Sequence, residues 1–174
     1  MGDRTPSQTK NLDRYGFPEL PWSRPHELLA AGPGDARTTF TLSTIRLDGR
    51  PHATGVGVRW HEGDLYFNSG PGTRKAKNLA ADPAAVLSVS LPGLDLVLEG
   101  EATKVTDRKV MEAVAAKFRE GGWPVEVKDG RLTAPFSAPS AGPPPWDFYR
   151  FRFQTVFGVA TAEPYGATRW RFGR

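Results

Sequence analysis

The sequence of 174 residues contains no cysteine and no long run of apolar residues. Without cysteine the chain has no disulfide framework, no zinc site of the usual kind and no thiol nucleophile. No apolar run approaches the roughly 18 residues that indicate a membrane-spanning helix. The segment from Met1 to Asn11 is polar and lacks the apolar core of a signal peptide. We therefore expect a cytoplasmic protein without a membrane partner.

Residues that commonly catalyse reactions are also scarce. The three histidines, His26, His52 and His61, stand in separate contexts without metal-ligand spacing, which favours surface or structural roles and predicts no metal site. No nucleophile-elbow serine, P-loop or paired-carboxylate pattern is present. The catalytic residues are therefore unknown from the sequence. If the protein is an enzyme, a bound cofactor is expected to carry the chemistry.

Length and charge allow one domain with a sizeable core. The net charge of +4 and the pI of about 9.6 favour an anionic small molecule or nucleic acid as the partner. We predict an N-terminal extension with a short helix over residues 1–37. The remainder, residues 38–174, is predicted to form one domain that includes a Pro-rich loop over residues 121–146.

Segments rich in alternating and β-branched residues predict a β protein. Asp48-Gly49 is a strong hairpin signal between the first two segments. A helix is expected over residues 108–120, capped by Thr106 or Asp107. The predicted strands are 38–47, 52–60, 65–68, 85–91, 95–105 and 148–161, with a short last piece at 169–172. Hairpin-linked strands with few helices between them indicate a six-stranded antiparallel barrel or sandwich, mainly β.

A short basic helix after the third strand suggests an anion site. Thr73 is placed to cap this helix, and Arg74 and Lys75 fall in its first turn, where cations oppose the helix dipole. An anion held by free N–H groups and both side chains would explain their position, and phosphate is the natural candidate. A solvated basic face is the alternative. We expect both side chains to lie near the surface.

The second strand carries two glycines of the same parity, Gly55 and Gly57, which face one side of the sheet. Glycine weakens a strand interior and often marks close approach by a ligand or another backbone. A flat ring system lying across the strand would explain both residues. A bulge or barrel corner that needs glycine explains them equally well.

These residues together resemble the flavin and deazaflavin oxidoreductases with the pyridoxamine-5′-phosphate-oxidase-like split barrel. The resemblance is carried by Asp48-Gly49-Arg50-Pro51-His52, Gly57-Val58-Arg59-Trp60, Leu65-Tyr66-Phe67-Asn68, the run from Thr73 to Leu79 with Asp82-Pro83, and residues 134–146 and 166–172. It implies a split barrel flanked by a few helices. It also implies a homodimer with two cofactor sites at the subunit interface.

The resemblance further implies which residues hold the cofactor. Arg74 and Lys75 would hold its phosphate at the helix capped by Thr73, and Asn78 fits a position where this branch usually keeps Asn. The residues that would lie along or border the ring are Thr54, Gly55, Val56, Gly57, Val58, Arg59, Phe67 and Asn68. Asp95 stands where pyridoxamine phosphate oxidases place Gln, and their C-terminal Arg-His pattern is absent. We therefore do not expect true pyridoxamine phosphate oxidase activity.

The C-terminal half resembles an actinobacterial branch that is often assigned the deazaflavin coenzyme F420, which favours F420 over FMN. The two cofactors share a tricyclic ring and a phosphate, and F420 adds an anionic oligoglutamate tail. Cations that would suit the tail are Lys77, Arg59, Arg169, Arg171 and Arg174. The implied activity is hydride transfer between the ring and a small organic substrate.

Two other functions stay open. One is a non-catalytic protein that binds a flavin or deazaflavin on the same fold. The other is a single-stranded nucleic-acid binder that stacks bases on Phe40, Trp60, Tyr66 and Phe67, although these look more like core residues.

The segments 85–91 and 95–98 are apolar at nearly every position. If only one face were buried, every second apolar side chain would be exposed to solvent. We therefore expect a second copy of the chain to cover the other face. The alternative is that the helix at residues 108–120 covers that face within one chain.

Overall fold

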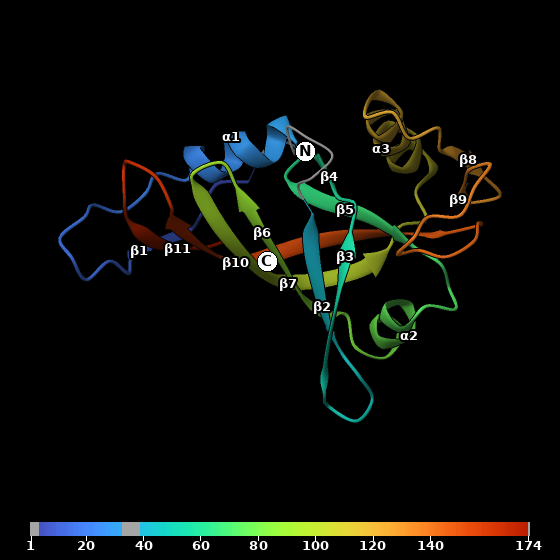
Figure 1. Ribbon diagram of the computed structural model, residues 1–174, viewed down its shortest axis with the longest axis horizontal. Helices are drawn as coiled ribbons and strands as arrows, with labels where there is room; N and C mark the ends of the chain where they lie inside the picture. Colours follow the sequence, from blue (N-terminus) through green and yellow to red (C-terminus); the bar gives the residue numbers. More distant parts are fainter. Residues whose placement is uncertain (1–3, 33–38, 174) are drawn as a thin grey trace.

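The computed structural model describes residues 4–32 and 39–173, which form an antiparallel β structure flanked by helices (Figure 1). The helices are α1 (Ser23–Ala31), α2 (Arg74–Ala81) and α3 (Arg108–Glu120). The strands are β1 (Gln8–Asn11), β2 (Phe40–Ile45), β3 (Pro51–Val56), β4 (Arg59–His61), β5 (Asp64–Ser69), β6 (Ala84–Leu91), β7 (Leu94–Lys104), β8 (Glu126–Lys128), β9 (Arg131–Thr133), β10 (Asp147–Ala160) and β11 (Ala167–Arg171).

Nine of these strands form one curled sheet in the order β1-β11-β10-β7-β6-β2-β3, with β5 joined to β10 and β4 joined to β5. Strand β10 is long enough to pair with β5 by its first half and with β11 by its second half. Along its other edge it pairs with β7, with an irregularity between Phe153 and Thr155. This architecture confirms the mainly β, antiparallel split-barrel prediction.

The structure differs from the predicted strands in three places, the first of which is the additional strand β1 before residue 38. The strand expected over residues 52–60 is divided at Gly57 and Val58, because β3 pairs with β2 whereas β4 pairs with β5. Inside the Pro-rich loop, β8 and β9 form a small separate hairpin. Strands of three residues are too short to show an alternating pattern, so the sequence did not reveal them.

The main core fills the concave side of the sheet. Alternate residues of each strand point inward, as Phe40, Leu42 and Thr44 do on β2, while their neighbours are only half-buried. Strands β6 and β7 contribute inward leucines and valines in the same way, and β10 adds aromatic rings. The period-2 pattern read from the sequence therefore places the core correctly.

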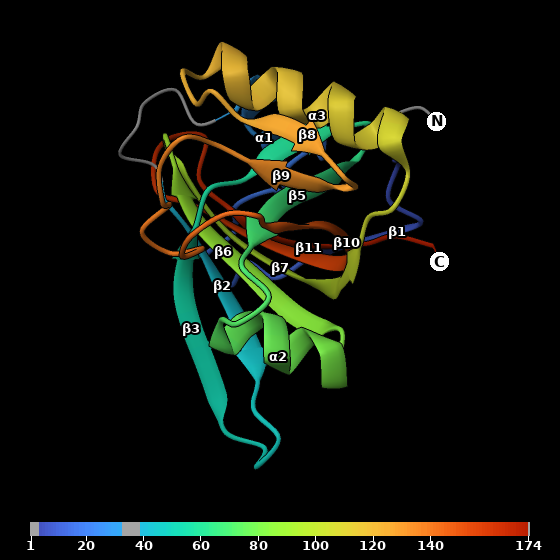
Figure 2. The ribbon, with the colours of Figure 1, turned by 90° about the vertical axis from the view of Figure 1, so that its right-hand side faces the viewer.

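A second apolar cluster joins α3 to the Pro-rich loop. Asp107 caps this helix by accepting hydrogen bonds from the N–H groups of Lys109 (2.8 Å) and Val110 (3.3 Å). The helix buries Met111 and Phe118 against Trp146 and its neighbours. It packs on β4 and β8 and therefore does not cover the outer face of β6 and β7, contrary to the single-chain alternative (Figure 2).

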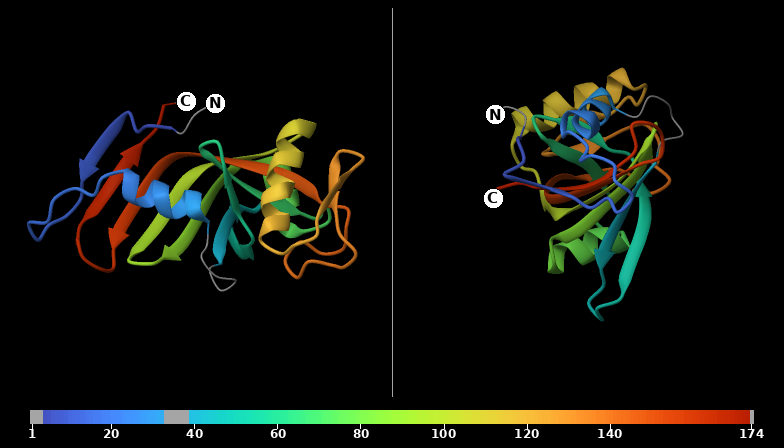
Figure 3. Two further views of the ribbon diagram at one scale, coloured as in Figure 1. Left: turned by 90° about the horizontal axis from the view of Figure 1, so that it is seen from above. Right: turned by 90° about the vertical axis from the view of Figure 1, so that its left-hand side faces the viewer.

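The described part of the N-terminal segment, residues 4–32, is packed onto the sheet. Strand β1 pairs with β11 from Gln8 opposite Arg171 to Asn11 opposite Thr168, and α1 is the short helix expected there. The Arg4 guanidinium donates to the carbonyl of Phe153 at 2.6 Å. Figure 3 shows β1 and β11 at one end of the molecule and the α3 region at the other. The division at residues 37 and 38, which lie outside the described residues, stays a prediction.

Candidate functional site

The start of α2 is built by a turn that follows β5. Thr73 has an extended backbone, and its Oγ1 accepts a hydrogen bond from the N–H of Ala76 at 3.3 Å, which confirms it as the cap. The same Oγ1 lies 2.7 Å from Ser69 Oγ. Gly70 donates its N–H to the carbonyl of Ala141 at 2.9 Å, and a side chain on Gly70 would collide with that carbonyl. The Pro-rich loop therefore lies directly against the beginning of α2.

Lys75 is buried, with only 2% of its surface exposed, so the expectation that it lies near the surface is wrong. Its Nζ donates to the backbone carbonyl of Ser140 in the loop that covers it. Burial lowers the pKa of the Lys75 ammonium group, because a charge is disfavoured away from water. No carboxylate of the described residues forms an ion pair with Lys75. Arg74, one residue earlier, is exposed as expected.

The hairpin of β2 and β3 brings an arginine and a histidine, Arg46 and His52, toward this helix. Asn78 Nδ2 on α2 donates to Thr44 Oγ1 on β2 at 2.9 Å, and both side chains are buried. His52 lies opposite Thr44 in the β2–β3 pairing. Burial lowers the pKa of the His52 imidazole, and the positive charges of Arg46, Lys75 and Arg74 lower it further. These residues, Arg46, His52, Arg74 and Lys75, are called the cation cluster.

Sequence reasoning found half of the cation cluster and missed the other half. Arg74 and Lys75 were recognised from their place in the helix, whereas His52 was assigned a surface or structural role and Arg46 received none. The hairpin signal at Asp48-Gly49 was the available clue, because the tight turn determines which residues of the two strands lie opposite one another.

Three buried side-chain nitrogens near this region have no hydrogen-bond partner in the described structure: Arg46 Nε, His52 Nδ1 and Asn68 Nδ2. An unpaired buried polar atom costs about 1–3 kcal/mol. Acceptor oxygens of a bound anion or ring system would remove that cost. The residues present therefore fit a phosphate-bearing ligand with a polar ring.

The predicted ring-binding strand is divided between core and surface. Val56 and Val58 are buried in the main core, and Thr54 lies opposite Leu42. Gly57 is exposed, its φ is not left-handed, and a Cβ atom there would meet nothing within 4 Å. No side-chain clash within the described chain therefore requires glycine at this position. The chain changes partner strands at Gly57, so both explanations given by the sequence, a barrel corner and close approach by a ligand or a second backbone, stay open.

Two of the predicted residues lie away from the cation cluster. The Arg59 guanidinium donates to the carbonyls of Val58 (3.0 Å) and Lys117 (3.4 Å), and it stacks on Phe118 with 4.9 Å to the ring centroid. It thus contacts α3, and Figure 2 shows α3 and α2 on opposite sides of the sheet. Phe67 is fully buried and stacked on Tyr149. Their contact with a cofactor stays a prediction.

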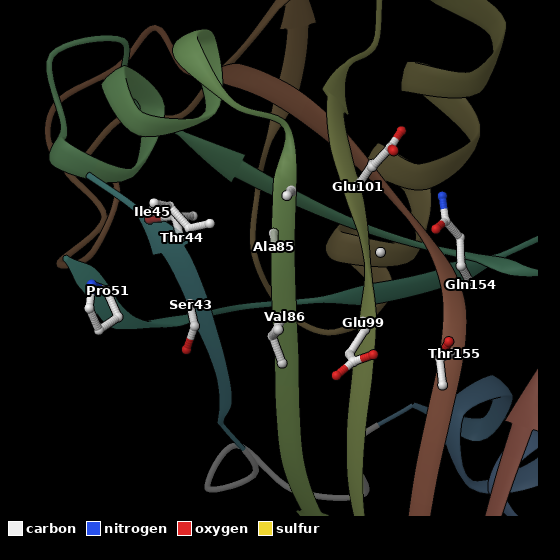
Figure 4. Close-up of a pocket in the computed structure, with 12 residues that line it drawn as sticks. Ser43, Thr44, Ile45, Pro51, Ala85, Val86, Glu99, Glu101, Gln154 and Thr155 are labelled. Carbon is white, nitrogen blue, oxygen red and sulfur yellow. The ribbon is translucent and has the colours of Figure 1, made fainter. Parts of the chain in front are cut away.

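A hollow of about 430 Å³ lies on the outer face of the sheet, across β3, β2, β6, β7 and β10 (Figure 4). Its wall is largely apolar, with small side chains such as Ser43 and Val86. The charged residues in its lining are Glu99 and Glu101, which would repel a phosphate. The anion site is therefore better placed at the cation cluster than in this hollow.

No group of three or more metal-ligating side chains occurs within residues 4–32 and 39–173. The helices of the same residues are all too short or too polar to cross a membrane. A cytoplasmic location stays a prediction.

Comparison with known families identifies the class of protein. The sequence profile of the pyridoxamine 5′-phosphate oxidase family matches residues 33–161. The chain belongs to this family, which confirms the resemblance seen in the sequence. A search of curated proteins found no match.

Solved structures share the fold at low sequence identity. An F420 reductase is 20% identical, with a TM-score of 0.52, covering 83% of this chain and 98% of that one. A NimC/NimA family protein from Clostridium acetobutylicum is also 20% identical, with a TM-score of 0.54 and coverage of 84% and 91%. A FAD-binding protein from Mesorhizobium loti is 19% identical, with a TM-score of 0.54 and coverage of 87% and 95%. Likeness at this level concerns the fold.

Proposed function

We propose that this protein is an oxidoreductase that uses coenzyme F420, with FMN as the alternative cofactor and a small organic molecule as its substrate. The proposal is supported by family membership and by fold neighbours whose names include an F420 reductase and a FAD-binding protein. When bound, the reduced ring of such a cofactor supplies hydride. The chain itself supplies binding and orientation.

The observation that carries the proposal is the buried Lys75 beside the exposed Arg74 at the start of α2, with no ion-pair partner for either among the described residues. Lys75 is 2% exposed, and no carboxylate of the described residues pairs with it or with Arg74. An uncompensated buried charge is costly, so such a group is expected to meet an anion when the protein is functional. In the first helical turn the N–H groups of Arg74 and Lys75 have no acceptor within the helix, whereas that of Ala76 donates to Thr73 Oγ1. A cofactor phosphate supplies both the charge and the acceptors.

The ring is proposed to lie against the exposed backbone at Gly57, within the stretch from Thr54 to Arg59, whereas Gly55 is half-buried and a Cβ atom there would meet Thr39 at 3.1 Å. Gly57 leaves space for a flat group, and the unpaired Nδ2 of Asn68 offers a donor to a ring carbonyl. No side chain is assigned the role of acid or base. The reaction would then depend on placing the substrate against the ring.

We also propose a homodimer formed through the outer face of the sheet. Glu99 on β7 and Arg171 on β11 both lie opposite Thr155 on β10, so they share this face. A two-fold axis can therefore bring Glu99 and Glu101 on β7 of one copy onto Arg169 and Arg171 on β11 of the other. The largely apolar hollow reaches from β3 to β10, with Glu99 and Glu101 in its lining. Light scattering at micromolar concentration tests the dimer, and a monomer would overturn it.

The choice of cofactor is tested by titrating the purified protein with FMN and with F420 and measuring both affinities by fluorescence. We expect F420 to bind more tightly than FMN, and binding of neither would remove the proposal. Turnover of reduced cofactor with a panel of acceptors then separates an enzyme from the non-catalytic binder. The nucleic-acid alternative is weakened, because Phe40, Trp60, Tyr66 and Phe67 are all buried. A salt-sensitive gel shift on oligonucleotides would revive it.

A further inference from the structure

The cation cluster is formed by two separate elements. Arg74 and Lys75 lie on α2, whereas Arg46 and His52 lie on the β2–β3 hairpin and are called the hairpin half. Arg46 follows Thr44 by two residues and therefore lies on the same side of the β2 hairpin arm. That side faces α2, since Thr44 is hydrogen-bonded to Asn78. Figure 2 shows the hairpin extending past α2 and beyond the body of the sheet. Arg46 and His52 thus continue the positive surface away from the start of α2.

The charge of Arg46 is only partly offset within the described chain: the Asp48 carboxylate attracts it at longer range but forms no ion pair with it. Asp48, at the hairpin turn, accepts two hydrogen bonds from the Arg50 guanidinium at 3.0 Å and 2.7 Å. No carboxylate of the described residues lies within ion-pair distance of Arg46. The Nε of Arg46 and the Nδ1 of His52 are both buried and unpaired. Two buried nitrogens on the same hairpin, neither with an acceptor in the described chain, indicate that a ligand supplies the acceptors.

A single phosphate at the start of α2 does not account for these donors, because Arg74, Lys75 and the first-turn N–H groups already suffice for it. We infer that the hairpin half, Arg46 and His52, binds a second anionic group of the cofactor, namely carboxylates of the oligoglutamate tail of F420. This inference rests on the proposed function and deepens it. FMN has no such group, so the hairpin half is the element that would distinguish the two cofactors.

The tail cations suggested by the sequence are less well placed. Arg59 contacts α3, and Arg169 and Arg171 lie on β11, at the other end of the sheet from α2 (Figure 1). Arg174 lies outside the described residues. Lys77 is exposed on α2 itself and is the one earlier candidate on the same side as the hairpin.

The charge state of His52 gives the inference a second signature. The groups around its imidazole are Arg46 on its neighbouring strand and Arg74 and Lys75 on α2, all positive. They disfavour the imidazolium until an anion arrives beside it. Binding of a carboxylate therefore goes together with uptake of a proton by His52. Affinity for F420 is expected to rise as the pH falls from 8 to 6, and affinity for a tail-free ligand is expected to change much less.

The experiment compares three ligands: F420, a tail-free form of F420 that keeps the phosphate, and FMN. Arg46→Gln should weaken F420 binding by about 10-fold or more, because one charge-assisted hydrogen bond is lost. The same variant should change the affinity for the other two ligands by less than about 2-fold. Lys109→Ala, which removes an exposed cation from α3, is the matched control and should change none of the three. Equal losses for all ligands in Arg46→Gln would overturn the inference.

The pH arm uses His52→Gln, which should flatten the pH dependence of F420 affinity. His61→Gln is the control, since His61 lies on β4 and its pKa is likewise lowered by burial. A pH dependence that survives in His52→Gln would contradict the inference. If the wild-type protein binds F420 and its tail-free form with equal affinity, the inferred tail site is wrong, whereas the proposed function still holds. If the protein binds none of the three ligands, both the tail site and the proposed function are wrong.

Discussion

Helices α2 and α3 begin with the same dipeptide in different surroundings. Each starts with Arg-Lys directly after a residue whose side chain caps the helix, Thr73 for α2 and Asp107 for α3. At α3 the cap is an acid that accepts two backbone hydrogen bonds, and Arg108 lies 3.9 Å from Glu112. Lys109 is exposed. At α2 the cap is neutral, the lysine is buried, and no carboxylate of the described residues forms an ion pair with Arg74 or Lys75.

The comparison shows that basic residues in a first helical turn do not by themselves define an anion site. At α3 the cap and the neighbouring glutamate supply the negative charge, and water solvates the rest. At α2 neither source is present, so the positive potential is left for a ligand. Burial and the lack of a counter-charge, which the dipeptide does not encode, make the difference.

The largest expected effect is at the buried lysine. Lys75→Met should weaken cofactor binding by about 30-fold or more, since a charge-assisted contact to the phosphate is lost. The free energy of unfolding should stay the same or rise by up to about 1 kcal/mol, because an unpaired buried charge is replaced by an apolar chain of similar length. Titration and urea denaturation measure the two quantities. A large loss of stability with unchanged affinity would mean that Lys75 serves only to hold the loop at Ser140.

Two exposed cations, Arg74 on α2 and Lys109 on α3, give the most direct contrast between the two helices. Arg74→Ala should weaken cofactor binding by about 10-fold, and Lys109→Ala by less than about 2-fold. Thermal unfolding in added inorganic phosphate gives an independent readout, since an anion that binds only the folded state raises Tm. The rise should shrink in Arg74→Ala and persist in Lys109→Ala. Equal behaviour of the two variants would erase the distinction between α2 and α3.

The caps Thr73 and Asp107 should contribute similar amounts to the free energy of unfolding, but their contributions should respond differently to salt. Thr73→Ala and Asp107→Ala are each expected to lower the free energy of unfolding by about 1 kcal/mol. The effect of Asp107→Ala should decrease at high salt, because part of it is attraction between a carboxylate and the helix dipole. The effect of Thr73→Ala should not, and Thr73→Ser should restore most of the stability. Denaturant titrations at low and high salt decide this.

The smallest expected effect concerns His52 and the pH dependence of stability without ligand. Its pKa is lowered in the folded protein by burial and by the neighbouring cations, so the unfolded chain takes up the proton first as the pH falls. Stability from this group is complete above about pH 6.5 and is lost as the pH falls toward the lowered pKa. His52→Gln should lose less stability between pH 8 and pH 5 than the wild type. An identical decline in both proteins would indicate that His52 is not perturbed.

Much of the fold could be predicted because it depends on local patterns. The alternation of Phe40, Leu42 and Thr44, the Asp48-Gly49 turn and the apolar run from β6 into β7 each indicate strands without knowledge of the rest of the chain. The predicted bounds of α3 match the observed helix. Strands β1, β8 and β9 were missed, because pairing with distant partners, and not their own pattern, holds them in place.

The sequence by itself determined the class of fold, the cap at Thr73 and the position of two cations at the start of α2, since these follow from spacing along the chain. Only the tertiary structure decided that Lys75 is buried beneath Ser140 and that Arg46 and His52 join it, while Arg59 contacts α3. Those outcomes depend on which loop covers a helix and on which strand lies beside it. They are contacts between residues far apart in the sequence, and periodicity carries no information about them.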